Sequence, residues 1–266
     1  LCFSSRGQVY WLKVYEVPQG SRISKGKPIV NLFPLMPGEK INAILAVKDF
    51  VDDEFIFMAT AKGTVKKTPL SDFSNPRKSG IIAIKLDNGD FLVGAGVTDG
   101  SNDIVLVSNG GKAVWFDEND VRSMGRNARG VRGMKLVENQ QVLSLLIASS
   151  DEQSVLVATE NGFGKRTVLS EFRKSGRGTQ GVKAIQVSDR NGIVIAAKLV
   201  GDHDELMLIT TGGVLIRTRV SEIRELGRAT QGVTLINLSK DEKLSGIEKI
   251  VETDQIDDDG QDELQI

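Results

Sequence analysis

The sequence predicts an all-β, propeller-like protein built from five successive repeats of about 50 residues each. Three observations support this prediction. A turn glycine recurs in constant phase, a second glycine ends an arginine-bearing loop in the same phase, and short apolar runs rich in β-formers lie between them. No segment of ten or more residues has the apolar periodicity of an amphipathic helix.

The two glycine markers define the repeat. The turn glycine recurs at intervals of 56, 48, 51 and 51 residues. The glycine that ends the arginine loop recurs at intervals of 54, 50, 51 and 51 residues. The two series are Gly7, Gly63, Gly111, Gly162 and Gly213, and Gly26, Gly80, Gly130, Gly181 and Gly232. Five copies of two markers in one phase identify a structural repeat.

Each repeat is expected to supply four strands, which in the second copy are 55–60, 64–68, 81–86 and 91–97. Short strands in fixed order are typical of propeller blades, whose sheets stack and so bury both faces. Asn-Gly pairs predict tight hairpin turns, at Asn88-Gly89, Asn109-Gly110, Asn161-Gly162 and Asn191-Gly192. The expected blades are 1–52, 53–101, 102–151, 152–203 and 204–250, with a sixth blade expected upstream of Leu1 in a longer chain.

Composition sets further limits. The single cysteine, Cys2, allows no internal disulfide and favours a reducing compartment, and no apolar run reaches the 18 residues of a membrane span. The net charge of −1 hides an asymmetry, because the last sixteen residues contain seven acidic residues and no basic one. Residues 1–250 therefore contain 34 basic and 28 acidic residues, a balance of +6. We expect residues 251–266 to form an acidic, disordered tail.

Catalytic and metal-binding patterns are not found in the sequence. The only histidine, His203, lies between two aspartates in a polar turn, and Cys2 lies in an apolar run typical of a small core residue. Metal sites and acid–base pairs need several convergent His, Cys or carboxylate groups. We therefore expect no catalytic residue, no metal and no cofactor in this chain.

Four segments carry a family resemblance: "MATAKGTVKKT" (58–68), "ATENGFGKRT" (158–167), "TRVSEI" (218–223) and "GRATQGV" (227–233). They resemble the C-terminal domain of the A subunit of bacterial DNA gyrase. The resemblance implies a β-pinwheel, in which neighbouring blades exchange strands, and a basic outer edge that bends and wraps double-stranded DNA so that the enzyme introduces negative supercoils. Alternatives are the corresponding domain of topoisomerase IV and a propeller that binds other proteins.

The resemblance has further implications. The catalytic groups, ATP and Mg²⁺ of the type II topoisomerase would belong to the gyrase B subunit or to the rest of the A subunit, in a cytoplasmic, nucleoid-associated bacterial enzyme. The family's hallmark box, Gln-Arg-Arg-Gly-Gly-Lys-Gly, is not present in these residues. We therefore expect the box-bearing blade upstream of Leu1.

The arginine loops are the first set of candidate DNA-binding residues. Each copy supplies at least one cation among small residues, which let the main chain approach a phosphate while arginine binds it bidentately. The candidates are Arg22, Lys25, Arg77, Lys78, Arg126, Arg129, Arg177 and Arg228. In the alternative interpretation, the glycines only serve turns and the arginines pair with local carboxylates such as Asp72, Glu171 or Glu222.

A second row lies four residues after the turn glycine, at Trp11, Lys67, Trp115, Arg166 and Arg217. These long side chains either pack on a blade face with their heads reaching water, or touch DNA at the outer edge. Lys66 and Lys165, one residue earlier, point to the opposite side of the strand and are also candidates. The acidic tail has two possible roles as well: it keeps the chain soluble, or it folds back on the basic edge and competes with DNA.

Overall fold

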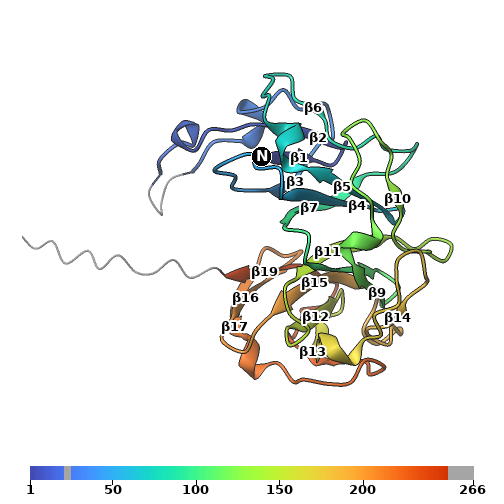
Figure 1. Ribbon diagram of the computed structural model, residues 1–266. Helices are drawn as coiled ribbons and strands as arrows, with labels where there is room; N and C mark the ends of the chain where they lie inside the picture. Colours follow the sequence, from blue (N-terminus) through green and yellow to red (C-terminus); the bar gives the residue numbers. More distant parts are fainter. Residues whose placement is uncertain (21–24, 251–266) are drawn as a thin grey trace, which may run out of the picture.

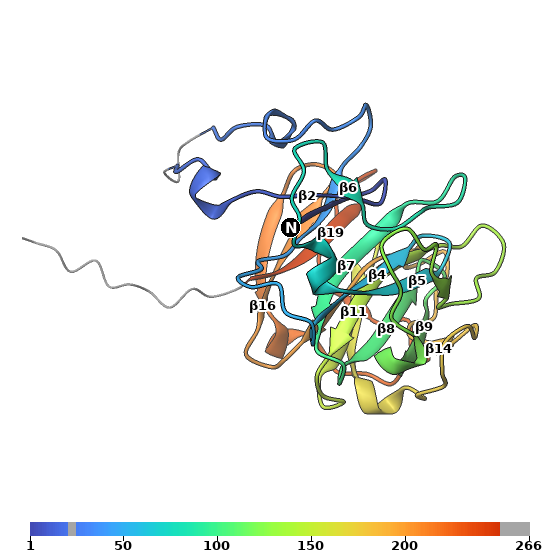
Figure 2. The same cartoon turned by 45° about the horizontal axis from the view of Figure 1, so that its top comes forward.

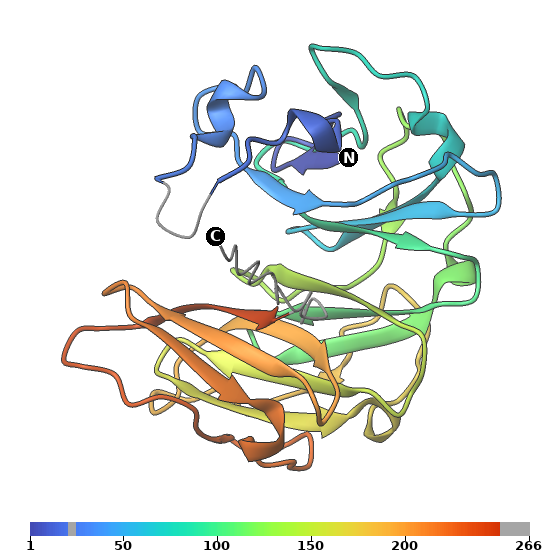
Figure 3. The ribbon, with the colours of Figure 1, turned by 90° about the vertical axis from the view of Figure 1, so that its left-hand side faces the viewer.

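The computed structural model describes residues 1–20 and 25–250 and is built from five antiparallel sheets (Figure 1). The sheets follow one another around a common axis, from the first repeat to the last (Figures 2 and 3). Their innermost strands, β3, β7, β11, β15 and β19, contact one another in that order. This arrangement confirms the propeller-like all-β prediction.

Repeats two to five share one order of elements: two long strands, a short 3-10 helix, a two-residue strand and a third long strand. Repeat one contains β1 (Cys2–Ser4), β2 (Gln8–Tyr10), η1 (Val14–Glu16), η2 (Ile29–Asn31) and β3 (Ile41–Ile44). Repeat two contains β4 (Phe55–Thr60), β5 (Thr64–Pro69), η3 (Leu70–Phe73), β6 (Ile81–Ile82) and β7 (Leu92–Thr98). Repeat three contains β8 (Asp103–Ser108), β9 (Lys112–Asp117), η4 (Glu118–Asp120), β10 (Val131–Arg132) and β11 (Val142–Ala148).

The last two repeats follow the same order. Repeat four contains β12 (Ser154–Thr159), β13 (Phe163–Val168), η5 (Leu169–Glu171), β14 (Val182–Lys183) and β15 (Val194–Val200). Repeat five contains β16 (Glu205–Thr210), β17 (Leu215–Arg219), η6 (Val220–Glu222), β18 (Val233–Thr234) and β19 (Leu244–Ile250). None of the described helices is long and apolar enough to cross a membrane.

Neighbouring repeats exchange their short strand. The sheet orders are β3-β1-β2-β6, β10-β5-β4-β7, β11-β8-β9-β14, β15-β12-β13-β18 and β17-β16-β19. The outermost strand of each of the first four sheets therefore comes from the following repeat. In the fifth sheet β17 is the outer edge within the described residues, and Leu215 and Ile216 are exposed there.

Two details of the predicted strands were wrong. The third strand is only two residues long, because Ala83 and Ile84 leave the ladder: both amides donate to the carbonyl oxygen of Gly7 and both side chains are buried. In addition, the Asn-Gly turns at 88–89 and 191–192 do not close hairpins, because the strands that they join belong to different sheets. The turns at 109–110 and 161–162 do lie in hairpins, between β8 and β9 and between β12 and β13.

The predicted turn glycines all occupy one hairpin geometry. Gly7, Gly63, Gly111, Gly162 and Gly213 have positive φ, which only glycine adopts readily. Each glycine amide donates to the carbonyl oxygen of a hydroxyl residue three positions earlier, at 3.0–3.1 Å. These hydroxyl residues are Ser4, Thr60, Ser108, Thr159 and Thr210. The repeat thus preserves a hydroxyl that the glycine spacing did not reveal.

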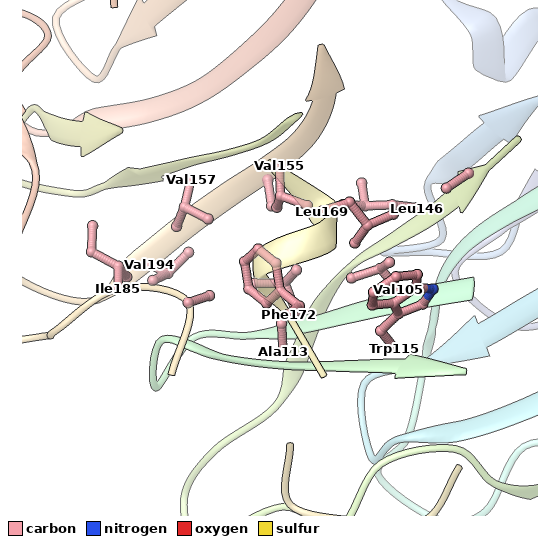
Figure 4. Packing of buried hydrophobic residues seen from close by; sticks show 14 residues of the cluster. Val105, Ala113, Trp115, Leu146, Val155, Val157, Leu169, Phe172, Ile185 and Val194 are labelled. Atoms are coloured by element: carbon pink, nitrogen blue, oxygen red, sulfur yellow. The ribbon is translucent and has the colours of Figure 1, made fainter. Parts of the chain in front are cut away.

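The apolar core lies between adjacent blades. One cluster joins Val105 and Trp115 of the third sheet to Val155, Val157 and Phe172 of the fourth repeat (Figure 4). Comparable clusters join the first and second repeats, the second and third, and the fourth and fifth. Full burial of one such side chain contributes about 1.5–3 kcal/mol, so each blade is stabilised mainly by its neighbours.

Candidate DNA-binding surface

The arginine loops cross the outer part of the preceding blade. Three equivalent amides just before or at the start of the loops donate to strands of that blade: Met124 to Lys67 at 2.9 Å, Ser175 to Trp115 at 3.0 Å, and Leu226 to Arg166 at 2.9 Å. Each loop then leads into the exchanged strand, which is the outermost strand of that sheet. The loops therefore lie along the outer edge of successive blades.

In the last three repeats, the glycine that ends the arginine loop is required by close packing. Gly130, Gly181 and Gly232 have positive φ, and a β-carbon there would lie 2.1–2.7 Å from a carbonyl oxygen of the preceding blade. At Gly181 that oxygen belongs to Ala113, only 2.1 Å from the added carbon. The positive φ supports the interpretation that these glycines serve turns, and their close packing, which the sequence did not predict, fixes how closely each loop approaches its neighbour.

The loop arginines face solvent to different degrees. Arg77, Arg129 and Arg177 are exposed, whereas Arg126 and Arg228 are half-buried. Among the described residues, none of them forms an ion pair with Asp72, Glu171 or Glu222. The ion pair found is Arg129 with Asp87 at 3.0 Å, and both side chains are more than half exposed. Exposed pairs of this kind contribute about 0–1 kcal/mol, so a phosphate can replace the aspartate.

The structure describes two of the three remaining loop candidates. Arg22 lies outside the described residues. Lys25 and Lys78 are exposed, the latter beside Arg77. Of the exposed loop arginines, Arg177 is held by the protein itself: its guanidinium group donates to the carbonyl oxygens of Asp120 at 2.9 Å and Arg132 at 3.0 Å.

The row four residues after the turn glycine is tied to the protein. Trp11 donates to the carbonyl oxygen of Phe73 at 3.0 Å, and Arg166 makes the equivalent bond to Ile223 at 2.8 Å while pairing with Asp202. The remaining partners are Asp103 for Trp115, Glu118 for Lys67 and Glu205 for Arg217. These contacts support the packing interpretation of the row.

Lys67 is the clearest case in this row. Its ammonium group lies 2.8 Å from the carboxylate of Glu118 and 4.2 Å from the ring centroid of Phe55. Both charged side chains are at most 5 % exposed. Because removing one member of a buried pair leaves an unpaired charge, Lys67 is held in a structural role.

Lys66 and Lys165 are not on the surface, so the expectation that they contact DNA directly was wrong. Both residues are fully buried, and their ammonium groups donate to main-chain carbonyls. Burial lowers the pKa of each ammonium group to about 8, and the nearby Arg126 or Arg228 adds to the effect. Strand alternation gave the side of the strand correctly, but it could not show that the next repeat covers that side.

A further row of exposed arginines was missed: Arg122, Arg173 and Arg224 each follow the apolar anchor after a 3-10 helix. The anchors Val121, Phe172 and Ile223 are buried, so the residue after each anchor turns outward. The signal was present in the sequence as a cation directly after the anchor in three consecutive repeats. These arginines belong with the candidate surface.

The groups with catalytic potential are isolated. Cys2 is buried in a small apolar cluster, where burial raises the pKa of its thiol, and His203 is exposed. In the described residues no group of three or more His, Cys, Asp or Glu side chains is placed to hold a metal ion. The arrangement instead places cationic loops one after another along the outer edge of the blades.

Fold and site together define a β-pinwheel, a propeller-like domain in which neighbouring repeats exchange a strand and cationic loops follow one another along the outer edge. The sequence pattern of the "DNA gyrase C-terminal domain, beta-propeller" family matches residues 1–48, 54–99, 102–149, 153–200 and 204–250. The chain belongs to this family.

Relatives and solved structures agree with this assignment. The chain is 51% identical over 252 residues to the DNA gyrase A subunit of Salmonella typhimurium, and 46% identical over 301 residues to that of Pseudomonas aeruginosa. These matches cover 95% and 97% of this chain but 29% and 32% of the relatives, so the chain spans about a third of their length.

The fold matches a DNA gyrase A C-terminal domain (TM-score 0.81, 29% identity, 94% of this chain and 81% of the other). It also matches the C-terminal domain of DNA topoisomerase IV (TM-score 0.87, 29% identity, 94% and 78%). The fold alone therefore does not separate the two enzymes. The identities of about half to gyrase A subunits favour gyrase.

Proposed function

We propose that this domain bends and wraps double-stranded DNA around the outer edge of its blades, largely without sequence specificity. One observation carries the proposal: an arginine-bearing loop leads into the outermost strand of successive blades, with Arg126, Arg177 and Arg228 four residues before the closing glycine and Arg77 three residues before it in a shorter loop. A repeated cation on a curved scaffold suits a phosphate backbone, which repeats along the duplex.

The family supports a role within DNA gyrase. In that setting the wrapped segment would be presented to the remainder of the gyrase holoenzyme, its B subunit included, with a fixed crossing sign, so that strand passage introduces negative supercoils. ATP and Mg²⁺ would be used elsewhere in that enzyme, in the bacterial cytoplasm at the nucleoid. This domain would contribute geometry and charge and perform no bond chemistry.

Wrapping, as distinct from binding, is tested by DNA topology. Relaxed circular plasmid is incubated with the 266-residue chain, nicked and resealed, and the protein is then removed. Wrapping of one hand leaves a shift in linking number that grows with the ratio of protein to DNA. Binding with no shift would contradict wrapping while leaving DNA binding intact.

A protein-binding role has one observation in its favour. Val14, Tyr15 and Val17 in the first repeat are exposed, Val14 and Tyr15 by more than four-fifths. Contiguous exposed apolar groups mark sites of protein–protein interaction. If replacing Val14 and Tyr15 with serine weakened DNA binding as much as replacing the loop arginines, this separation of the two surfaces would be wrong.

A further inference from the structure

Two buried lysines lie beneath two of the arginine loops. Lys66 donates to the carbonyl oxygen of Ala83 at 2.7 Å and to that of Arg126. Lys165 donates to the carbonyl oxygen of Gly227 at 2.6 Å. The acceptors Arg126 and Gly227 belong to loops that lie 60 and 62 residues further along the chain. Each lysine therefore connects one blade to the arginine loop of the next repeat.

Burial of these ammonium groups is costly, and it is not offset by an ion pair. Both lysines are fully buried, and neither forms an ion pair in the part of the chain that the structure describes. A buried charge without a paired counterion is rare because desolvation is unfavourable. Such a group persists where its hydrogen bonds achieve something that an apolar side chain cannot.

The charged neighbours of the two lysines match. The carboxylate of Asp72 raises the pKa of Lys66 and the Arg126 guanidinium lowers it. Glu171 and Arg228 do the same for Lys165. Burial lowers the pKa of both ammonium groups most, and in both clusters an acid of the lysine's own repeat and an arginine of the next loop act on the ammonium group electrostatically.

The fold itself does not need a lysine at this position. The equivalent residues in the other repeats are Tyr10, Val114 and Ile216. Val114 is fully buried beneath loop 176–181, as the lysines are beneath theirs. An apolar residue therefore suffices to pack the blade, and the lysines must be explained by their bonds to the loop.

The loop above Val114 shows what the lysines replace. There, Arg177 holds the loop itself by donating to the carbonyl oxygens of Asp120 and Arg132. Above the lysines, the guanidinium groups of Arg126 and Arg228 have no hydrogen-bond or ion-pair partner among the described residues. Where a lysine secures the main chain from below, the arginine of that loop is left available.

We propose that Lys66 and Lys165 are positioning residues of the DNA-binding surface, each holding one arginine loop so that Arg126 or Arg228 is free to bind phosphate. The proposal rests on the proposed function, because it assigns the two freed arginines to DNA. It makes the arginine loops unequal: loops 125–130 and 227–232 are secured from beneath, and loop 176–181 is secured by its own arginine.

The test compares the Lys66→Met/Lys165→Met double variant with Val114→Met in the 266-residue chain. Methionine keeps the length of the lysine stem and removes the donors, and Val114→Met changes the equivalent site without removing one. Amide hydrogen exchange reports on the loops, and titration of a fluorescent duplex at several salt concentrations reports on DNA binding. Thermal unfolding is measured in parallel.

In the double variant, exchange should accelerate at 126–129 and 228–230 and stay unchanged at 177–180. The dissociation constant should rise roughly tenfold, because two loops must now be ordered on binding. The slope of log K against log salt should fall by up to about 2, for two lost phosphate contacts. Val114→Met should leave both the dissociation constant and the salt slope unchanged. A merely structural role predicts the opposite pattern, namely a changed melting temperature with unchanged DNA affinity and salt slope.

Unchanged exchange in both loops would overturn the proposal, and so would faster exchange with unchanged affinity. If the wild-type chain showed no salt-dependent DNA binding, the proposed function would fail on that result alone, before any variant is compared. Should the double variant not fold, Lys165→Met alone serves as the test, with loop 125–130 as its internal reference.

Discussion

The α-carbon of Gly162 packs against the carbonyl oxygen of Ile236, and a methyl group on Gly162 would lie 2.5 Å from that oxygen. Gly162 ends a hairpin in the fourth repeat, whereas Ile236 follows the exchanged strand of the fifth. The same approach occurs at Gly7, Gly63 and Gly111, at 2.6 Å each. The repeated hairpin glycine is thus a point of close contact between one repeat and the next.

Gly213 offers a matched control for this contact. It has φ +81°, against +80° at Gly162, but nothing lies within 4 Å of its added β-carbon. Alanine at either site costs about 1–2 kcal/mol for the left-handed backbone. Gly162→Ala should cost about 1–3 kcal/mol more, from overpacking against Ile236. Urea unfolding of the two variants measures the difference. Equal losses in the free energy of unfolding would show that the contact between repeats accommodates a methyl group without cost.

Replacing the loop arginines should weaken DNA binding far more than replacing exposed basic residues in the turns before the innermost strands. The loop variant changes Arg77, Arg126, Arg129, Arg177 and Arg228 to glutamine together. Each phosphate contact contributes about 0.9 to the salt slope, so the loss should reach several units and exceed tenfold in affinity near 0.1 M salt. Fluorescence anisotropy with a labelled duplex measures both quantities.

The control for this experiment is Arg190→Gln with Lys240→Gln, which lie in turns before the innermost strands β15 and β19. Arg224 would be a poor control, because it belongs to the exposed row that includes Arg122 and Arg173. Equal losses in the loop variant and the control would remove the site assignment without removing DNA binding.

The buried lysines should make stability depend on alkaline pH. Their pKa in the folded state is about 8, below the 10.5 of an exposed lysine. Between these values the unfolded chain binds more protons, so the free energy of unfolding should rise with pH by at most about 1.4 kcal/mol per pH unit for each lysine. The penalty of burying the charge is fully present below pH 8 and is relieved toward pH 10.5.

The measurement is urea unfolding at pH 7.5, 8.5 and 9.5 for the wild-type chain and the Lys66→Met/Lys165→Met variant. The difference between the two chains isolates the lysines from all other titrating groups. Parallel pH profiles would mean that the two ammonium groups titrate as in water, contrary to their burial.

The acidic tail, residues 251–266, lies outside the described residues, and its competition with DNA stays a prediction. Deleting it should tighten binding to duplex DNA, most visibly at low salt, because seven acidic residues and no basic one are removed. Titrations of the full and shortened chains at two salt concentrations measure the effect. An unchanged affinity would leave only a solubilising role.

Much of the fold could be predicted because certain residue types, above all glycine, are required by particular backbone conformations. Gly63 and Gly162 must be glycine for their positive φ, so the repeat is visible as spacing. The exchanged strand was harder to predict, because Ile81 and Ile82 begin a longer apolar run that is typical of a longer strand. Its pairing with β2 depends on a neighbouring repeat that no local pattern describes.

The candidate surface was predicted only in part, for the same physical reason. Exposure of Arg77 and Arg129 follows from their position in polar loops. The burial of Lys66 depends on a loop 60 residues away that covers it. A strand pattern shows which side a residue faces, but it does not show what lies on that side.

The most direct test of the account is the salt dependence of DNA affinity for the 266-residue chain. The dissociation constant for a duplex of about 40 base pairs is measured between 50 and 200 mM salt, with several unrelated sequences. Wrapping through the arginine loops predicts a steep loss of affinity with a slope of several units, nearly the same for every sequence. An affinity that does not change over this range would contradict it.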